Sequence, residues 1–455
     1  MGVSGSRINI NEYSDGCYLP IVASKVKGLS SNSASPTDTW IIDTKQGVYY
    51  DNERVNKIFL KYFIDPYSLP PQKDIYQQEL YKDIQGLRYE VSMYRDVIRP
   101  LIDYKVCPHF IKYYGSGYSC NKSNMIKTLI EAGFSEEDAK NGLKNNTLYM
   151  GNKWKERPSI ENNIKADLSQ ITVFPTFYPT NSNPDVNYTL LMNEVIPENA
   201  ITFDELFTSN INEDFFNFLY PVFYSCYCMT LSKTNHNDLH FGNIYVIPRA
   251  TPKIIRYDVE DFKPVYIRSE YDVKIYDFDR SYSEKLGMNV GNTNKYREDT
   301  GARNNFVPIK DFFKVLLIYG LYKRDNQSSK IVLDFLCGNN KRLRQQIINL
   351  AKDRDCVFYR FGGNYIGDDF LNSLRSPKEI MKYIADMDIN NSLSRYDEKY
   401  TVKSEMFHPD DGTLKLDVKD YTLEKEVREL REEVEKCRER QKEELDNMMI
   451  ISPTE

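Results

Sequence analysis

The segment from His236 to Asn243 carries the side chains whose types and spacing are best suited to chemistry. Asp238 and Asn243 lie five residues apart in it, and the apolar run Ile244–Val246 follows directly. A carboxylate can accept the proton of an attacking hydroxyl group, and an amide oxygen five residues later can reach a Mg²⁺ ion. The spacing predicts a loop for phosphoryl transfer, although by itself it also fits an Asp- and Asn-rich surface turn.

A second acidic segment follows an apolar strand. Residues 273–279 read Val-Lys-Ile-Tyr-Asp-Phe-Asp, so Asp277 stands directly after a predicted buried strand. Mg²⁺ prefers hard oxygen ligands, keeps several of its waters and takes only one or two carboxylates from a protein. Asp277 and Asn243 are therefore the predicted Mg²⁺ ligands, and Asp238 is the predicted catalytic base. Two such segments in this order are hard to reconcile with chance.

The elements that must position these groups follow from the pattern of apolar residues. Short strand-like runs cover residues 40–42, 48–50 and 55–64, where Val, Ile, Phe, Leu and Tyr suit a pleated, half-buried surface. Helical spacing of apolar residues predicts a helix over 74–102, and a further strand is expected at 188–195. These runs predict a β-rich unit with one main helix.

Beyond residue 200 the pattern is mainly helical. A short helix is expected from Asp204, a long apolar one over 215–231 despite Pro221, and another over 310–322. Ser376 begins a further helix as its N-cap, since Pro377 and Glu379 follow at the positions that favour a helix start.

The chain resembles the eukaryotic protein kinase superfamily in its divergent branch. The run Asp-Leu-His-Phe-Gly-Asn at 238–243 is similar to the haspin-type variant of the catalytic loop, and residues 223–246 resemble kinases encoded by large cytoplasmic DNA viruses. The resemblance implies an α+β, bilobal protein-kinase-like fold, with a small β-rich N-lobe carrying one helix and a larger helical C-lobe. It also implies a protein serine/threonine kinase that uses ATP and Mg²⁺.

Further roles come from the resemblance residue by residue. The lysine that contacts the α- and β-phosphates should be Lys61, in Ile-Phe-Leu-Lys at 58–61, with Lys57 on the same face of the strand as its competitor. Its carboxylate partner would be Glu90, with Glu79 as the second choice.

Two more positions follow from the same comparison. The strand 188–194 would enter the hinge, where backbone groups near Glu194 and Val195 could meet adenine. Asp311 resembles the buried aspartate that braces the catalytic loop from the C-lobe.

The chain also departs from the family pattern. No Gly-x-Gly-x-x-Gly is present, and Gly28 and Gly47 are the only candidate remnants. Asn237 replaces the usual arginine, so that position has no arginine to dock a phosphorylated activation loop, and Asp279 replaces the usual glycine. No Ala-Pro-Glu follows residue 280, which leaves ordinary substrate docking open.

The predicted organisation has five parts. They are an N-terminal extension (1–36) that could include the nucleotide loop, an N-lobe (37–196), an insertion within it at about 119–187, a helical C-lobe (197–400), and a C-terminal helix or short coiled coil (418–448). In the last part Leu, Val and Cys residues recur over 423–437 at heptad spacing, which is compatible with self-association or with a single exposed helix.

Composition limits the compartment and the partners. The net charge is −6, so no general attraction to nucleic acid is expected. Eight cysteines without a Cys-x-x-Cys pair, and no secretory leader, indicate a reducing, cytoplasmic setting, in a host cell or virion if the protein is viral. No transmembrane segment is expected, whereas Gly2 with Ser6 fits a myristoylation pattern that would give peripheral membrane contact.

Three functions stay open at this level. The first is a protein kinase with an unidentified protein substrate. The second is a small-molecule kinase of the choline or aminoglycoside type, which uses similar motifs. The third is a pseudokinase scaffold, favoured by the missing glycine-rich loop and the heptad tail. A scaffold has no physical need for Asp238, Asn243 and Asp277 at their spacings, so an enzyme is the preferred interpretation.

Overall fold

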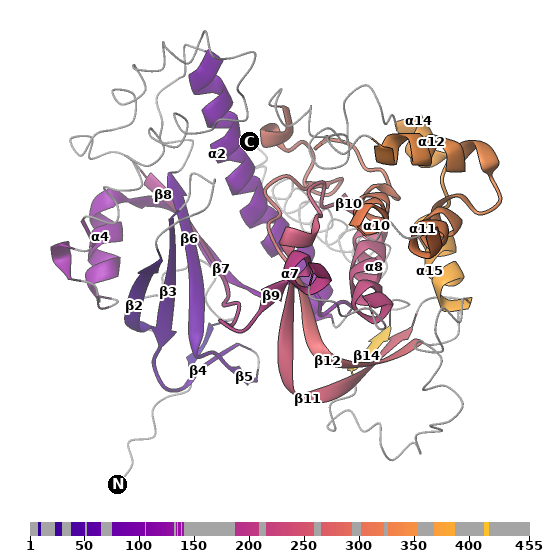
Figure 1. Ribbon diagram of the computed structural model, residues 1–455. Coiled ribbons are helices and arrows are strands. Elements are labelled where there is room, and N and C mark those ends of the chain that lie inside the picture. The colour runs from indigo at the N-terminus through magenta and orange to yellow at the C-terminus, as the bar shows by residue number, and fades with distance from the viewer. Residues whose placement is uncertain are drawn as a thin grey trace, which may run out of the picture.

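A computed structural model shows a β-sheet unit and a helical unit, with helix α2 running between them (Figure 1). It describes residues 8–10, 23–29, 38–50, 52–64, 75–104, 106–140 apart from 132, 134 and 138, 187–208, 215–258, 265–293, 302–322, 326–352, 368–386 and 414–417. The architecture is mixed α+β, with strands gathered in the first part of the chain and helices in the later part, as a kinase-like fold requires.

A five-stranded antiparallel sheet forms the core of the first unit. Its strand order is β2-β3-β6-β8-β7, with bounds Ala23–Leu29, Asp38–Thr44, Lys57–Ile64, Asn187–Glu194 and Tyr113–Asn121. A small sheet of β1 (Ile8–Asn9), β4 (Val48–Tyr50) and β5 (Glu53–Arg54) packs nearby. The strands predicted at 40–42, 48–50, 55–64 and 188–195 are all present.

Buried and partly exposed side chains alternate along the central strand of the sheet, as expected for a strand with one face in the core. In strand β6, Ile58, Leu60 and Tyr62 are fully buried, whereas the residues between them are not. Tyr62 lies between Trp40 of β3 and Tyr188 of β8, with ring centroids 4.4 Å and 6.0 Å away. Such cross-strand aromatic contacts fix the register of neighbouring strands. The register in turn presents the opposite face of β6, including Lys61, toward α2.

The helix predicted over 74–102 is confirmed, with one irregularity. Helix α2 (Ile75–Met93) continues through a π-helical turn (Tyr94–Ile98) into α3 (Arg99–Asp103). Tyr94, Val97 and Ile98 in that turn are buried. A π turn inserts an extra residue into the helical repeat, and such turns are frequent at functional sites.

The helical unit is built around α8 (Phe215–Leu231) and α10 (Lys310–Tyr322), both of which the apolar pattern predicts. Helix α8 is apolar on nearly all sides, and its side chains from Leu219 to Met229 are buried; Figure 1 shows it next to α10. The other α-helices in the described part of the chain are α4 (Lys122–Glu131), α7 (Phe203–Thr208), α11 (Asn326–Cys337), α12 (Lys341–Lys352), α14 (Asp368–Asn372) and α15 (Pro377–Asp386).

The predicted start of α15 is confirmed in detail. The Ser376 hydroxyl accepts from the Glu379 backbone N–H at 3.3 Å, and the Glu379 carboxylate accepts from the Ser376 N–H at 2.8 Å. This reciprocal pair satisfies two donors at the helix terminus.

A long hairpin connects the two units. Strands β11 (Ile244–Asp258) and β12 (Val265–Ile275) pair antiparallel, and β9 (Ile201–Thr202) and β14 (Leu414–Asp417) pair with β11. A short ladder joins β10 (Thr234–Asn235) to β13 (Tyr282–Ser283). Asn243 directly precedes β11 and Asp277 follows β12, and because Ile244 pairs with Ile275, both lie at the same open end of the hairpin, side by side.

Some predictions from the sequence differ from the structure, and others concern residues that the structure does not describe. Residues 23–29, placed in the N-terminal extension, form strand β2 of the main sheet. Strand β7 (Tyr113–Asn121) runs into the insertion predicted at about 119–187, and α4 follows inside it. Gly2, the heptad run 423–437 and the rest of 418–448 lie outside the described residues, as do 141–186. None of the helices that the structure describes is long and apolar enough to span a membrane.

Candidate active site

One buried carboxylate holds the loop 236–243, which the sequence predicts to be catalytic. Asp311, at the start of α10, accepts from the backbone N–H groups of His236 and Asn237 at 2.9 and 3.1 Å. It also accepts from the side-chain amide of Asn235 at 3.1 Å. Hydrogen bonds to a charged acceptor are about twice as strong as neutral ones. The bracing that the sequence assigned to Asp311 is present in the structure.

The loop itself places Asp238 next to Asn243. The Asn243 side-chain nitrogen donates to the Asp238 backbone carbonyl at 2.9 Å, across a short 3₁₀ turn formed by Phe241–Asn243. Because this bond holds the amide nitrogen, the amide oxygen, which is the atom that an asparagine can offer to a metal ion, is directed away from the Asp238 carbonyl. Asn237 just before has φ of 65°, a left-handed conformation that asparagine tolerates better than most residues.

Basic groups surround the Asp238 carboxylate. Lys314 Nζ lies 3.2 Å from Oδ1, while Arg280 and His240 lie 3.6 and 3.9 Å from Oδ2. Burial alone would raise the pKa of Asp238, but the charges of Lys314 and Arg280 outweigh it and hold that pKa well below its usual range. Asp238 is therefore ionised at neutral pH, as a proton acceptor must be.

Asp277 follows strand β12 in a conformation that residues other than glycine rarely adopt. Its φ is 70°, and its backbone N–H donates to the Tyr94 hydroxyl at 3.3 Å. The next side chain, Phe278, is fully buried and packs against Tyr94, His236 and Phe110, with centroids 5.2, 4.7 and 6.0 Å apart. The aromatic contacts hold the left-handed turn in place, and the strain coincides with the predicted metal ligand.

Lys61 and Glu90 meet between strand β6 and helix α2. Lys61 Nζ donates to Glu90 Oε2 at 2.7 Å, and Glu90 is 2% exposed. Burial raises the pKa of Glu90 to about 7, although the charge of Lys61 opposes that shift. Burial would lower the pKa of Lys61, but Glu90, Asp277 and Asp279 together raise it. Lys61 thus lies in the electrostatic field of both the helix and the Asp277 segment.

Of the two lysines weighed from the sequence, the structure pairs Lys61 with Glu90. Lys57 is exposed at the start of β6, opposite Asp43 of strand β3. Glu79 lies on α2 in the part whose side chains the structure does not describe. Gly47 lies in the turn after β3, at the opposite end of that strand from Thr39, the residue that pairs with Lys61. Gly28 pairs with Trp40 near the Lys61 end of the sheet.

The acidic pair formed by Asp277 and Asp279 predicts a pH effect on stability. Burial and the charge of Asp279 raise the pKa of Asp277 from 3.8 to about 6. A raised carboxyl pKa means that the folded state binds a proton more readily than the unfolded state, so stability from this group is lost as pH rises from about 4 to about 6. One pKa unit corresponds to about 1.4 kcal/mol.

We therefore expect Asp277→Asn to gain stability relative to the wild type with rising pH. In urea unfolding without divalent cations, the difference in unfolding free energy between the two proteins should change by about 2–3 kcal/mol between pH 4.5 and 7. Comparing the two proteins cancels other titrating groups, such as His109. Parallel stability curves for the two proteins would show that Asp277 has an ordinary pKa.

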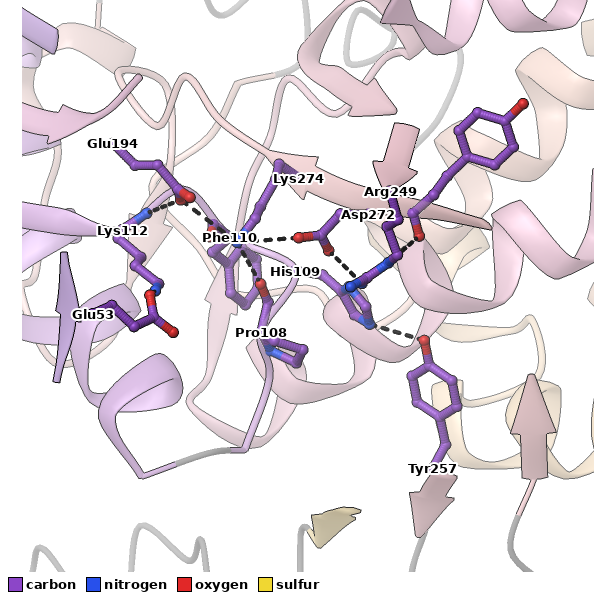
Figure 2. A network of polar contacts seen from close by, with 11 residues as sticks. Glu53, Pro108, His109, Phe110, Lys112, Glu194, Arg249, Tyr257, Asp272 and Lys274 are labelled. Carbon is purple, nitrogen blue, oxygen red and sulfur yellow. Dashed lines mark hydrogen bonds and ion pairs between the residues drawn. The ribbon is translucent and has the colours of Figure 1, made fainter. Parts of the chain in front are cut away.

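Glu194, expected at the hinge, belongs to a polar network that the sequence did not reveal (Figure 2). Its backbone N–H donates to the Lys112 carbonyl at 2.9 Å, and its carboxylate accepts from the Lys112 N–H at 3.2 Å. The Glu194 N–H is therefore occupied and is not a free contact for adenine. Val195 follows the end of strand β8 and lies beyond the ladder that β8 forms with β6.

Lys274 lies at the centre of this network, on strand β12 just before Asp277. Its Nζ donates to the carbonyls of Pro108 and Phe110 at 3.0 and 3.3 Å and lies 3.5 Å from Glu194 and 4.0 Å from Asp272. Figure 2 shows Lys274 among Glu194, Asp272, Pro108 and Phe110. The only sequence signal was a lysine within an apolar strand, a pattern that usually marks an exposed position.

The network continues on the far side of Asp272. Arg249 of β11 donates to the Asp272 carboxylate at 3.1 Å, a contact drawn in Figure 2, and to the Tyr271 carbonyl at 2.9 Å. Nearby, the buried His109 ring shares a hydrogen bond of 2.9 Å with the Tyr257 hydroxyl, and burial lowers the pKa of His109 to about 4. Hydrogen bonds and ion pairs of side chains thus join Glu194 at the end of β8, the loop 107–112 and the β11–β12 hairpin.

The segment after Asp277 is held by uncharged amides. Asn237 Nδ2 donates to the carbonyls of Arg280 and Arg303, and Asn289 Nδ2 donates to those of Asp279 and Ser281. Asn292 and Asn304 add bonds to Arg280 and Asn289. The Tyr89 hydroxyl of helix α2 accepts from Ser283 N–H at 2.9 Å and donates to the Gly287 carbonyl at 3.0 Å. We call the bonds donated by the side-chain amides of Asn237, Asn289, Asn292 and Asn304 the asparagine clamp, and they hold residues 279–292 in place.

The donor set suits a hard divalent cation. Asn243 and Asp277 offer one amide oxygen and one carboxylate, which fits Mg²⁺ because that ion keeps most of its waters. Within the described part of the chain, no three His, Cys, Asp or Glu side chains gather as a metal site. The site would therefore bind the ion jointly with phosphate oxygens.

No protein-family model matches the chain, and no curated protein matches it. Among solved structures, the chain is similar to the crystal structure of the kinase domain of PF14_0431, with 12% sequence identity and a TM-score of 0.30. The match covers 81% of this chain and 96% of that domain.

Proposed function

We propose that the chain is an ATP-dependent phosphotransferase of the protein-kinase type, with a protein serine or threonine hydroxyl as acceptor. One observation carries the proposal. The Lys61–Glu90 ion pair, 2.7 Å long and buried, lies in the electrostatic field of Asp277, and Asp277 lies in that of Asp238. Side chains from a sheet strand, a helix and two loops thus lie close enough to influence one another electrostatically, which supports a site for phosphoryl transfer.

Each residue has a definite task in this proposal. Asn243 and Asp277 would hold Mg²⁺, which neutralises phosphate charge when bound. Lys61, kept charged and oriented by Glu90, would bind the α- and β-phosphates of ATP. Asp238 accepts the proton of the acceptor hydroxyl as the hydroxyl oxygen bonds to the γ-phosphorus and the bond to the β–γ bridging oxygen breaks. ADP leaves with that electron pair. Positioning and charge neutralisation, rather than covalent chemistry, supply the rate.

The charges around Asp238 bear on the acceptor. Kinases of the choline and aminoglycoside type phosphorylate cationic small molecules. Here Lys314 and Arg280 lie 3.2 and 3.6 Å from the Asp238 carboxylate, so a cationic acceptor would meet two permanent positive charges at the point of reaction. Repulsion in a half-buried site is costly. This observation favours a neutral or anionic acceptor, such as a hydroxyl of a protein side chain.

The decisive experiment is phosphate transfer from ATP by the purified protein in the presence of Mg²⁺, with wild type and Asp238→Asn compared. Autophosphorylation and generic protein acceptors are assayed, and phosphorylated residues are identified by mass spectrometry. Loss of the base should lower turnover about 10²–10⁴-fold. Transfer confined to phosphoserine and phosphothreonine supports the proposal. No transfer by wild type with any acceptor would contradict it and favour a scaffold without activity.

A matched pair of lysine variants tests the nucleotide site. Lys61→Met should lower kcat/KM for ATP about 10²-fold or more, because it removes a preorganised positive charge. Lys57→Met, on the same face of strand β6 but exposed, should leave kcat/KM within about twofold, since exposed charges interact weakly. Steady-state kinetics at varied ATP measures both. Equal losses in the two variants would contradict the assignment of Lys61.

A further inference from the structure

Asn193, near the end of strand β8, is a buried polar residue whose side-chain oxygen has no partner. The residue is 5% exposed, and no donor in the described part of the chain lies within hydrogen-bond distance of its Oδ1 atom. Leaving a buried acceptor without a donor is unfavourable, and most such oxygens in folded proteins are bonded. The unpartnered oxygen therefore raises the question of what supplies its donor.

The register of the sheet places Asn193 on the face that carries Lys61. Asn193 pairs with Phe59 of strand β6, and Leu191 pairs with Lys61. Residues directly opposite each other in an antiparallel ladder point to the same face, as do residues two apart on one strand. Lys61 reaches Glu90 of helix α2 from that face. Asn193 thus lies on the side of the sheet that faces the candidate active site, two positions along from Lys61.

Donors next to Asn193 are bonded to other acceptors. The hydroxyl of Tyr113, which pairs with Asn193 from strand β7, donates to Ser116 Oγ at 2.7 Å. The backbone N–H of Glu194 donates to the Lys112 carbonyl at 2.9 Å, and the Lys112 N–H donates to the Glu194 carboxylate at 3.2 Å. The neighbouring residues thus complete their own bonds and leave the Asn193 oxygen available to a ligand.

The position suits the base of a nucleotide whose phosphates lie at Lys61. Two residues of a strand span about 6.6 Å, which leaves room for the ribose between base and phosphates. Phe59, half-buried and opposite Asn193, offers an aromatic ring of the kind on which bases stack. An asparagine amide can bond adenine through two atoms, with its oxygen accepting from N6 and its nitrogen donating to N7.

Guanine fits the same amide poorly. Its N7 and O6 are both acceptors, whereas adenine offers the N7 acceptor and the N6 donor. An asparagine amide has one acceptor and one donor on this edge, so one of its two contacts to guanine would oppose two acceptors whichever way the amide is turned.

We propose that the side-chain amide of Asn193 binds the N6 and N7 edge of adenine and so selects ATP over GTP. The inference rests on the proposed function and names the group that recognises the base. The backbone N–H of Glu194 cannot take this part, because it is bonded to the Lys112 carbonyl. The ligand's amino group supplies the donor that the buried Asn193 oxygen lacks in the described part of the chain.

The experiment measures by calorimetry the affinities for MgATP, for MgGTP, and for 7-deaza-ATP with Mg²⁺, in which a C–H group replaces N7. Wild type should bind MgATP at least about tenfold more tightly than MgGTP and several-fold more tightly than 7-deaza-ATP. Leucine is nearly the size of asparagine but has no polar side-chain atom. In Asn193→Leu, the ratio of ATP to GTP affinity should therefore fall about tenfold, and ATP and 7-deaza-ATP should bind equally.

Thr189→Val is the matched control. Thr189 lies on the same strand and the same face as Asn193, is fully buried, and also has a side-chain oxygen without a partner in the described part of the chain. It pairs with Phe63, on the far side of Lys61 from Asn193. Both affinity ratios in Thr189→Val should therefore equal those of wild type.

The outcomes separate this inference from the function on which it rests. Wild type that binds ATP and 7-deaza-ATP equally, or Asn193→Leu with wild-type ratios, would overturn the inference and leave the phosphotransferase standing. Wild type that binds none of the three nucleotides would overturn both. Should Asn193→Leu not fold, Asn193→Ser replaces it, and wild-type ratios in that variant overturn the inference in the same way.

Discussion

Replacing Asp277 with alanine is expected to abolish magnesium-dependent nucleotide binding and to lower turnover by a factor on the order of 10³. Asp277 follows strand β12 by two residues and lies in the electrostatic field of both Lys61 and Asp238. Its left-handed φ of 70° aims the side chain in a direction that a neighbouring residue could not reproduce. Isothermal titration with ATP, with and without Mg²⁺, measures the binding.

The control for this variant is another aspartate-to-alanine change at a distance. Asp369 is exposed at the start of helix α14, and Asp369→Ala should retain wild-type binding and turnover. In Asp277→Ala, ATP should bind equally weakly with and without Mg²⁺. If Asp277→Ala still binds ATP more tightly with Mg²⁺ than without it, Asp277 is not a ligand of the metal ion and the assignment made from the sequence is wrong.

The largest effect on stability is expected for Asp311→Asn. The Asp311 carboxylate is 3% exposed and accepts three hydrogen bonds from the catalytic loop, at 2.9, 3.1 and 3.1 Å. An asparagine offers one acceptor oxygen and turns an amide donor toward buried donors, so at least one N–H loses its partner. Loss of charge and an unsatisfied buried donor together should cost about 3–5 kcal/mol in unfolding free energy.

Asp334→Asn provides a matched comparison. Asp334 forms an ion pair with Arg344 between helices α11 and α12, with both side chains more than a fifth exposed. Partly exposed pairs contribute little, so this variant should lose less than about 1 kcal/mol. Urea unfolding followed by circular dichroism measures both variants. Equal losses would show that Asp311 is an ordinary charge and not the brace of the loop.

Sequence reasoning was most successful where the chemistry is local. Asp238 and Asn243 are five residues apart, and the bond between them at 2.9 Å closes within one turn, so their spacing already encodes their geometry. The helices and the strands around Lys61 follow from apolar periodicity for the same reason. The roles of these residues remain predictions, whereas their proximity is a property of the fold.

The rest depends on contacts between distant segments. Lys314 lies 76 positions from Asp238, and Lys274 lies 166 from Pro108, and nothing in either local sequence marks a partner. Both lysines stand in apolar runs where burial is decided by packing of the whole molecule. Strand β2 was also missed, because a Ser-rich run beside it outweighed its short alternating pattern. Such features require the topology to be known first.

The asparagine clamp has a consequence for the response of the protein to ionic strength. Salt screens interactions between charges, whereas hydrogen bonds from amides to carbonyls carry no net charge to screen. The bonds of Asn237, Asn289 and Asn292 should therefore persist at molar salt, when exposed ion pairs such as Lys233–Glu284 have weakened. The segment beside Asp277 would keep its shape over a wide range of ionic conditions.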